Sequence, residues 1–187
     1  VRLQGADFTH MNLAGADFRD SDLSKSKFCF ANISGAAFQG CDLRESDFSH
    51  SSIAGANVVI AKISGVPLGN INHTNFRSSS MKGSDFSRTK IEKADFVDAD
   101  LQECHFEFAQ IRHSEFGRTS LSKAKFNNTE IEHCDFSGIF ANELSVLRCN
   151  FNQSLFNSSD LTGTEFTNCN FEKCGITDAF LAKVKFR

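Results

Sequence analysis

A large apolar side chain, Phe or an aliphatic, recurs at every fifth position over most of the chain. The first run extends from Leu3 to Leu68, and a second extends from Phe76 to Phe136 and continues less regularly to Phe186. A period of five matches neither the 3.6 residues of a helical turn nor the two-residue alternation of an ordinary strand. The period therefore indicates a short structural repeat, whose units must stack because no single unit can bury its own large side chain.

A second inward-facing position accompanies each large residue. The residue two positions earlier is almost always small, as at Ala6, Ser26, Cys41 and Thr89. The remaining three residues of each unit are mostly polar. Each unit is thus expected to direct one large and one small side chain into a common core and its polar side chains toward water.

Several units share one pattern: a small residue, Asp or Asn, Leu or Phe, and two polar residues. The clearest are Ala6-Asp7-Phe8-Thr9-His10, Ala94-Asp95-Phe96, Ala99-Asp100-Leu101 and Ser159-Asp160-Leu161-Thr162-Gly163. In this pattern the sequence resembles the pentapeptide-repeat family, over essentially all of residues 1–187. The resemblance implies an all-β fold, a right-handed, four-sided parallel β-helix with four pentapeptides per coil, in a single domain. The 187 residues hold about 37 units, hence about nine coils and, at a strand spacing of ~4.8 Å, a rod of roughly 43 Å.

Phe and aliphatic residues alternate at the central position of successive units. Phe therefore recurs every ten residues from Phe8 to Phe48 and from Phe76 to Phe136. In a coil of four units, this alternation predicts Phe on two opposite sides and Leu or Ile on the other two. Seventeen of the 21 Phe residues occupy central positions and are expected in the core.

The other four Phe residues fall outside the central positions and are expected on the surface. Exposed aromatic side chains on a polar rod are candidate contacts for a protein partner. Isolated exposed apolar residues are also common without any function, so both interpretations stay open. These residues are Phe30, Phe108, Phe140 and Phe180.

The repeat is interrupted first near its middle. Leu68 and Phe76 are eight residues apart where two units need ten, and Pro67 cannot donate a ladder hydrogen bond. We therefore expect a contracted side and a kink, or an irregular coil, near residues 66–75. The interruption is either a tolerated defect or a bend that fits the rod to a partner.

A second interruption covers residues 138–147. The count of five is kept, but Ala141 stands at a central position while large residues stand at positions meant for small ones. This exchange predicts either a bulge or a side that turns Phe140 and Leu147 outward.

The sequence predicts no catalytic, metal or cofactor site. Six of the seven cysteines occupy the small inward position and are expected as reduced packing residues. Cys149 and Cys169 stack in adjacent coils, but their parallel side chains disfavour a disulfide. His113 and His133 are neighbours in the same way, and two ligands do not complete a zinc site. Because the polar residues lie on flat outer faces without a cleft, we expect no enzyme.

The composition also indicates where in the cell the protein is expected. No run of 18 apolar residues exists in the sequence, so we expect no transmembrane helix and no membrane partner. An odd number of cysteines without a disulfide framework favours a reducing compartment, and we expect the cytoplasm.

The two ends of the printed chain lie within the repeat. The chain begins inside a unit and stops one residue after Phe186, without the C-terminal helix that gyrase-binding members of the resembled family usually carry. Two expectations stay open: the ends stack on other copies as an end-to-end homo-oligomer, or the chain is a segment of a longer protein.

Two functions remain from the resemblance and the surface charge. The best-known members of the resembled family bind type II topoisomerases by imitating duplex DNA. B-DNA carries one charge per ~1.7 Å, so a ~43 Å rod would need on the order of 25 negative charges, whereas the chain has 23 acidic and 20 basic residues, a net charge of −3. We therefore prefer a non-catalytic protein-interaction scaffold, with no direct nucleic-acid binding, and keep a topoisomerase-directed DNA mimic as the alternative.

Local mimicry stays open because one outward row is acidic. Asp95, Glu115 and Asp135 follow each other at intervals of 20 residues, and are therefore expected to stack on one side of the rod. Arg118 lies nearby and should weaken this acidic row. Asp at this position can equally serve the turn geometry of the repeat.

Overall fold

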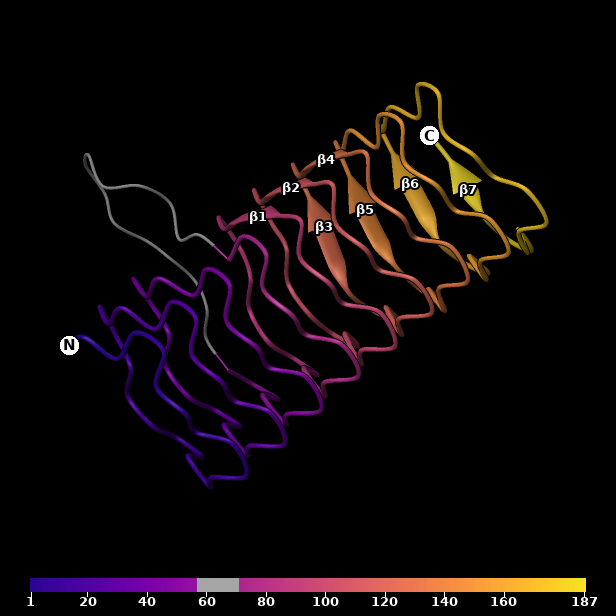
Figure 1. The fold of residues 1–187 in the computed structure, drawn as a ribbon. Helices are drawn as coiled ribbons and strands as arrows, with labels where there is room; N and C mark the ends of the chain where they lie inside the picture. The colour runs from indigo at the N-terminus through magenta and orange to yellow at the C-terminus, as the bar shows by residue number, and fades with distance from the viewer. Residues whose placement is uncertain (57–70) are drawn as a thin grey trace.

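The computed structural model describes residues 1–56 and 71–187. Figure 1 shows the described chain as coils stacked along one axis, with the N-terminus at one end of the stack and the C-terminus at the other. Neither described range contains a helix that is long and apolar enough to cross a membrane.

Seven short strands form two parallel sheets in the described chain. Partners in each pair are 20 residues apart, as in Ile91 with Ile111 and Phe126 with Val146, so one coil consists of four pentapeptides. The sheets have the orders β1-β2-β4 and β3-β5-β6-β7. The strands are β1 (Lys90–Glu92), β2 (Gln110–Arg112), β3 (Lys125–Asn127), β4 (Glu130–Glu132), β5 (Ser145–Leu147), β6 (Glu165–Thr167) and β7 (Lys185–Phe186).

Isolated parallel bridges extend the same pairing along the rest of the rod. One ladder of bridges passes through nine levels, in agreement with the predicted number of coils. The all-β solenoid expected from the five-residue period is thus confirmed. The ladder joins Asp7, Lys27, Asp47, Asn75, Asp95, Glu115, Asp135, Leu155 and Gly175.

The coil that includes residues 57–70 is longer than the others. Asp47 pairs with Asn75, a separation of 28 residues where the other steps of this ladder span 20. The core crosses this coil without a gap, because the Phe48 ring stacks on the Phe76 ring at a centroid distance of 5.1 Å. The predicted contraction was wrong, because this step is eight residues longer than the others. Residues 66–70 of the predicted irregular stretch lie outside the described residues.

The sequence pattern did not identify Ile71 as a central residue of the repeat. Ile71, five positions before Phe76, is fully buried and is a regular central residue of the core, so the repeat resumes one unit earlier than expected. Residues 71–75 therefore belong to the regular repeat. Pro67 and Leu68, on which the expectation rested, lie outside the described residues.

The polar residue before each central residue shapes the following corner. Asp95 Oδ1 accepts a hydrogen bond from the Val97 backbone N–H at 2.9 Å, and Asp135 Oδ1 accepts one from Ser137 at 2.8 Å. The residue two positions after the centre then adopts a left-handed conformation, as at Phe108 with φ of 60°. Local hydrogen bonding by Asp and Asn thus turns the chain at regular intervals.

Two columns of Phe rings fill the core, as the alternation predicts. Rings in the same column stack, as Phe96 does on Phe116 with centroids 4.7 Å apart and planes inclined by 12°. Rings in opposite columns meet edge to face, as Phe86 and Phe96 do at 6.1 Å and 89°. Both arrangements suit the quadrupole of an aromatic ring, so the columns support each other across the core.

Residues 138–147 exchange large and small side chains without opening the core. Ala141 is fully buried at a central position, and Ile139 and Leu144 are buried at positions that elsewhere hold small residues. Phe140 points outward and is 56% exposed. Of the two outcomes expected from the sequence, the outward turn is observed for Phe140, whereas Leu147 is only partly exposed.

Phe96→Ala is expected to lower the free energy of unfolding by about 3–5 kcal/mol, because it removes a fully buried ring from a stacked column. Urea unfolding followed by circular dichroism measures the change. Phe108→Ala provides the control: its ring is 54% exposed, so the loss should stay below about 1 kcal/mol. Equal losses for both variants would contradict the assignment of Phe96 to the core.

Candidate interaction surfaces

The predicted acidic row exists as a continuous ladder on the outside of the rod. Asp95 pairs with Glu115, and Glu115 pairs with Asp135, in successive coils. Asp95 and Asp135 also serve the turns described above, so the structural role considered from the sequence holds for these two. Glu115 is exposed and makes no such turn contact.

Ion pairs neutralise only part of this row. Arg77 binds the Asp95 carboxylate, with Nη2 2.7 Å from Oδ2. Arg118, which the sequence placed beside the row, instead pairs with Asp98 at 2.7 Å, and this contact lowers the pKa of the Asp98 carboxyl. Within residues 1–56 and 71–187, no basic side chain forms an ion pair with Glu115 or Asp135.

The side of the rod that carries this row has an excess of acidic residues. We call it the acidic side and define it as the outward residues around the column that runs from Phe8 through Phe156 to Ile176, with the corner that follows. It holds seven acidic and three basic residues, a net charge of −4, whereas the whole chain has −3, so all other residues together sum to +1. Its charged residues are Asp7, Lys27, Asp47, Arg77, Asp95, Asp98, Glu115, Arg118, Asp135 and Asp178.

The four Phe residues outside the repeat are exposed, as predicted, but they do not form one patch. Phe30 lies on the corner of the acidic side, and Phe108 lies on the opposite corner beneath the Arg88 guanidinium, 5.2 Å from the ring centroid. Phe140 and Phe180 share a third ladder, separated by one coil. Their exposed fractions lie between 54% and 68%.

A row of three rings on the acidic side escaped the sequence interpretation. The Phe30 ring stacks between the imidazoles of His10 and His50, at centroid distances of 5.1 and 4.9 Å. The sequence does indicate this row, because His10, Phe30 and His50 are spaced by 20 residues, the length of one coil. Phe30 is thus held in place by two neighbours and does not stand as an isolated exposed ring.

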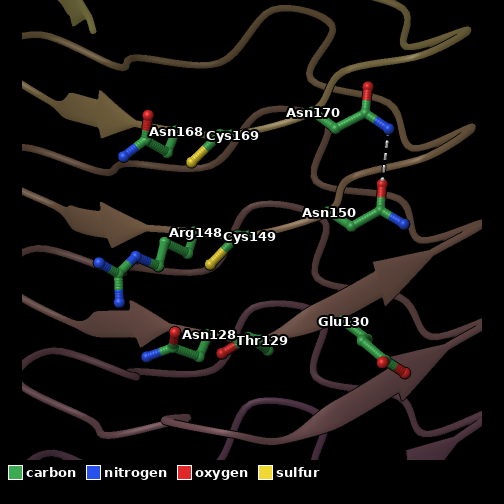
Figure 2. Close-up of a pocket in the computed structure, with 9 residues that line it drawn as sticks. All are labelled: Asn128, Thr129, Glu130, Arg148, Cys149, Asn150, Asn168, Cys169 and Asn170. Atoms are coloured by element: carbon green, nitrogen blue, oxygen red, sulfur yellow. Dashed lines mark hydrogen bonds between the residues drawn. The ribbon is translucent and has the colours of Figure 1, made fainter.

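A shallow groove of about 420 Å³ lies at one corner near the C-terminal end. Figure 2 shows Cys149 and Cys169 in neighbouring segments of the chain, among the residues that line this groove, with both sulfur atoms directed the same way. The interaction between the two thiols raises the pKa of Cys149, which burial raises further, and lowers the pKa of Cys169. The groove is lined by Asn128, Thr129, Glu130, Arg148, Cys149, Asn150, Asn168, Cys169 and Asn170.

The remaining candidates for chemistry are sparse. His113 and His133 stack at a centroid distance of 4.9 Å, as the 20-residue spacing predicted. The described residues contain no group of three or more His, Cys, Asp or Glu side chains arranged to hold a metal ion.

One family model matches most of the chain. This model describes pentapeptide repeats and matches, in eight copies, residues 2–36, 31–66, 70–107, 99–138 and 148–187. The chain belongs to the pentapeptide-repeat family. No curated protein matches the chain in a sequence search.

The chain is also similar to solved structures. HetL, a pentapeptide-repeat protein from the cyanobacterium Nostoc sp. strain PCC 7120, is 14% identical, with a TM-score of 0.54 over 99% of this chain and 86% of HetL. Trypsin-treated QnrB1, a plasmid-mediated fluoroquinolone resistance protein, is 18% identical, with a TM-score of 0.48 over 95% of this chain and 87% of QnrB1. At these identities the likeness to HetL establishes the pentapeptide-repeat fold and nothing finer.

Proposed function

We propose that this pentapeptide-repeat chain is a non-catalytic rod that binds protein partners through its outer faces. The observation that carries this proposal is the presence of four half-exposed Phe rings on a rod whose other 17 Phe residues all occupy central positions of the repeat. Large exposed aromatic side chains are typical anchors of protein interfaces. The rigid coil would present them in fixed positions, which limits the entropy lost on binding.

Two further observations support this proposal. The polar side chains described above lie on regular outer faces, and a shallow, open groove does not exclude water as an active site does. HetL, which has a similar fold, is involved in the regulation of heterocyst differentiation, and a regulatory binding role agrees with a rod of this kind. The seven free cysteines support a reducing compartment such as the cytoplasm.

Affinity capture from cells of the source organism tests the binding role. The tagged wild-type chain is expected to retain a defined protein that Phe140→Ser or Phe108→Ser releases, because each change removes an exposed ring without disturbing the core. Ser120→Ala, on the same ladder as Phe140, is the matched control and should retain the partner. The proposal fails if neither Phe variant, each with an unchanged unfolding midpoint, alters what the chain captures.

The charge of the acidic side favours a second candidate, a topoisomerase-directed DNA mimic. This side concentrates the whole negative net charge of the chain, and within the described ranges Glu115 and Asp135 have no ion-pair partner. A type II topoisomerase recognises the phosphate charge of DNA through basic side chains. The acidic side supports imitation of one face of a duplex and not of its whole circumference.

A DNA gyrase supercoiling assay tests this second candidate. Under the mimic, on the order of micromolar protein alters supercoiling, or protects gyrase from a quinolone, and Glu115→Lys combined with Asp135→Asn abolishes the effect. Asn at position 135 keeps an acceptor for the Ser137 N–H while it removes the charge. Glu143→Lys combined with Asp160→Asn, on another side of the rod, makes the same change of three charges and should have no consequence. No effect of the wild-type chain on gyrase would exclude the mimic and leave the scaffold proposal standing.

A further inference from the structure

Cys149 and Cys169 occupy the same small inward position in two adjacent coils. The bridge between Asn150 and Asn170 places the two segments side by side, and Figure 2 shows both thiols directed the same way along the groove. Within residues 1–56 and 71–187 no other two cysteines are stacked in this way. Both thiols are free.

The spacing of these thiols suits a metal ion better than a disulfide. Neighbouring strands lie ~4.7–4.9 Å apart, and parallel side chains keep roughly this separation at their tips. A disulfide needs its sulfur atoms ~2.05 Å apart. A zinc–thiolate bond is ~2.3 Å long, so two bonds of about this length on opposite sides of a single ion span ~4.6 Å, close to the distance between coils.

We propose that Cys149 and Cys169 form a two-thiolate site for a soft monovalent metal ion of the copper(I) type. The ion lies between the two sulfur atoms in a linear, two-coordinate arrangement. Thiolates select soft ions of this kind over hard ones. The site is independent of the partner-binding role proposed above.

The surroundings of the two thiols fit this chemistry. Each thiol now donates its proton to a backbone carbonyl: Cys149 to Phe126 O at 2.8 Å and Cys169 to Thr167 O at 3.4 Å. On binding, the two S–H bonds break, two S–metal bonds form, and two protons pass to water, with no change of oxidation state. The resulting complex has one negative charge, and the positively charged Arg148 is among the residues that line the same groove.

The number of ligands discriminates against zinc. A structural zinc site needs four ligands in a tetrahedron, and the described residues hold no group of three. The next position along the same ladder is Thr129, which adds no thiolate. Cys169 is half-buried in an open groove, so an ion reaches the pair from solvent.

Anaerobic titration of the whole chain with copper(I), in competition with a coloured copper(I) chelator, tests the proposal. Wild-type protein is expected to take up one tightly bound equivalent. Cys149→Ser and Cys169→Ser should each abolish the tight uptake, because each removes one of only two thiolate ligands. Cys174→Ser, which changes another half-buried thiol without a stacked partner, is the matched control and should bind as the wild type does.

A second variant keeps the test valid if the serine variants fold poorly. Ser154 stands between Cys134 and Cys174 on a neighbouring corner, so Ser154→Cys stacks three thiols and is expected to add a second tight equivalent. Wild-type affinity in either of the Cys149→Ser and Cys169→Ser variants would overturn the proposal. So would a wild-type chain that binds copper(I) no more tightly than Cys169→Ser does.

Discussion

The stacking of equivalent side chains at the distance between neighbouring strands is the constraint on which the rest of this structure depends. Phe28 and Phe48 show it most simply, with parallel rings 4.6 Å apart. A large ring stacks well at this distance on a ring of similar orientation, so each coil must bring its Phe back to the same position. A regular coil of four five-residue units does this in 20 residues, and the long coil does it in 28.

The same constraint organises the surface. Because inward residues stack every 20 positions, outward residues also stack, and the exterior consists of ladders of neighbouring side chains. The acidic row, the stack of His10, Phe30 and His50, and the thiol pair are all products of this registry. Function in such a rod therefore depends on which residue types coincide on one ladder, and not on the repeat itself.

The fold was predictable from sequence because each unit repeats the same requirement. Phe and aliphatic residues alternate at the central positions, as at Phe8 and Leu13, and this alternation correctly predicted rings on two opposite sides of the coil. The Phe residues outside the central positions were correctly expected on the surface. Whether those Phe residues contact a partner stays a prediction. The stacked rings around Phe30 could have been found by comparing positions 20 apart, which is the period of the coil and not of the unit.

Other features could not be obtained from the spacing alone. The long coil was misread because the five-residue count continues to Leu68, and counting on from Leu68 does not reach Ile71, which the structure shows as a buried central residue. Arg118 forms its ion pair with Asp98. This pairing depends on the direction of a flexible side chain, which the repeat does not specify. The exchange of Ala141 with its larger neighbours left two outcomes open, because either preserves the total volume of the core.

A double-mutant cycle across the long coil tests most directly the claim that one stacked core continues through the rod. Phe48→Leu and Phe76→Leu, singly and together, are compared by urea unfolding. The account predicts a coupling of about 0.5–1.5 kcal/mol, equal to that of Phe96 with Phe116, where no coil is lengthened. Additive effects of Phe48 and Phe76, with coupling retained between Phe96 and Phe116, would contradict it.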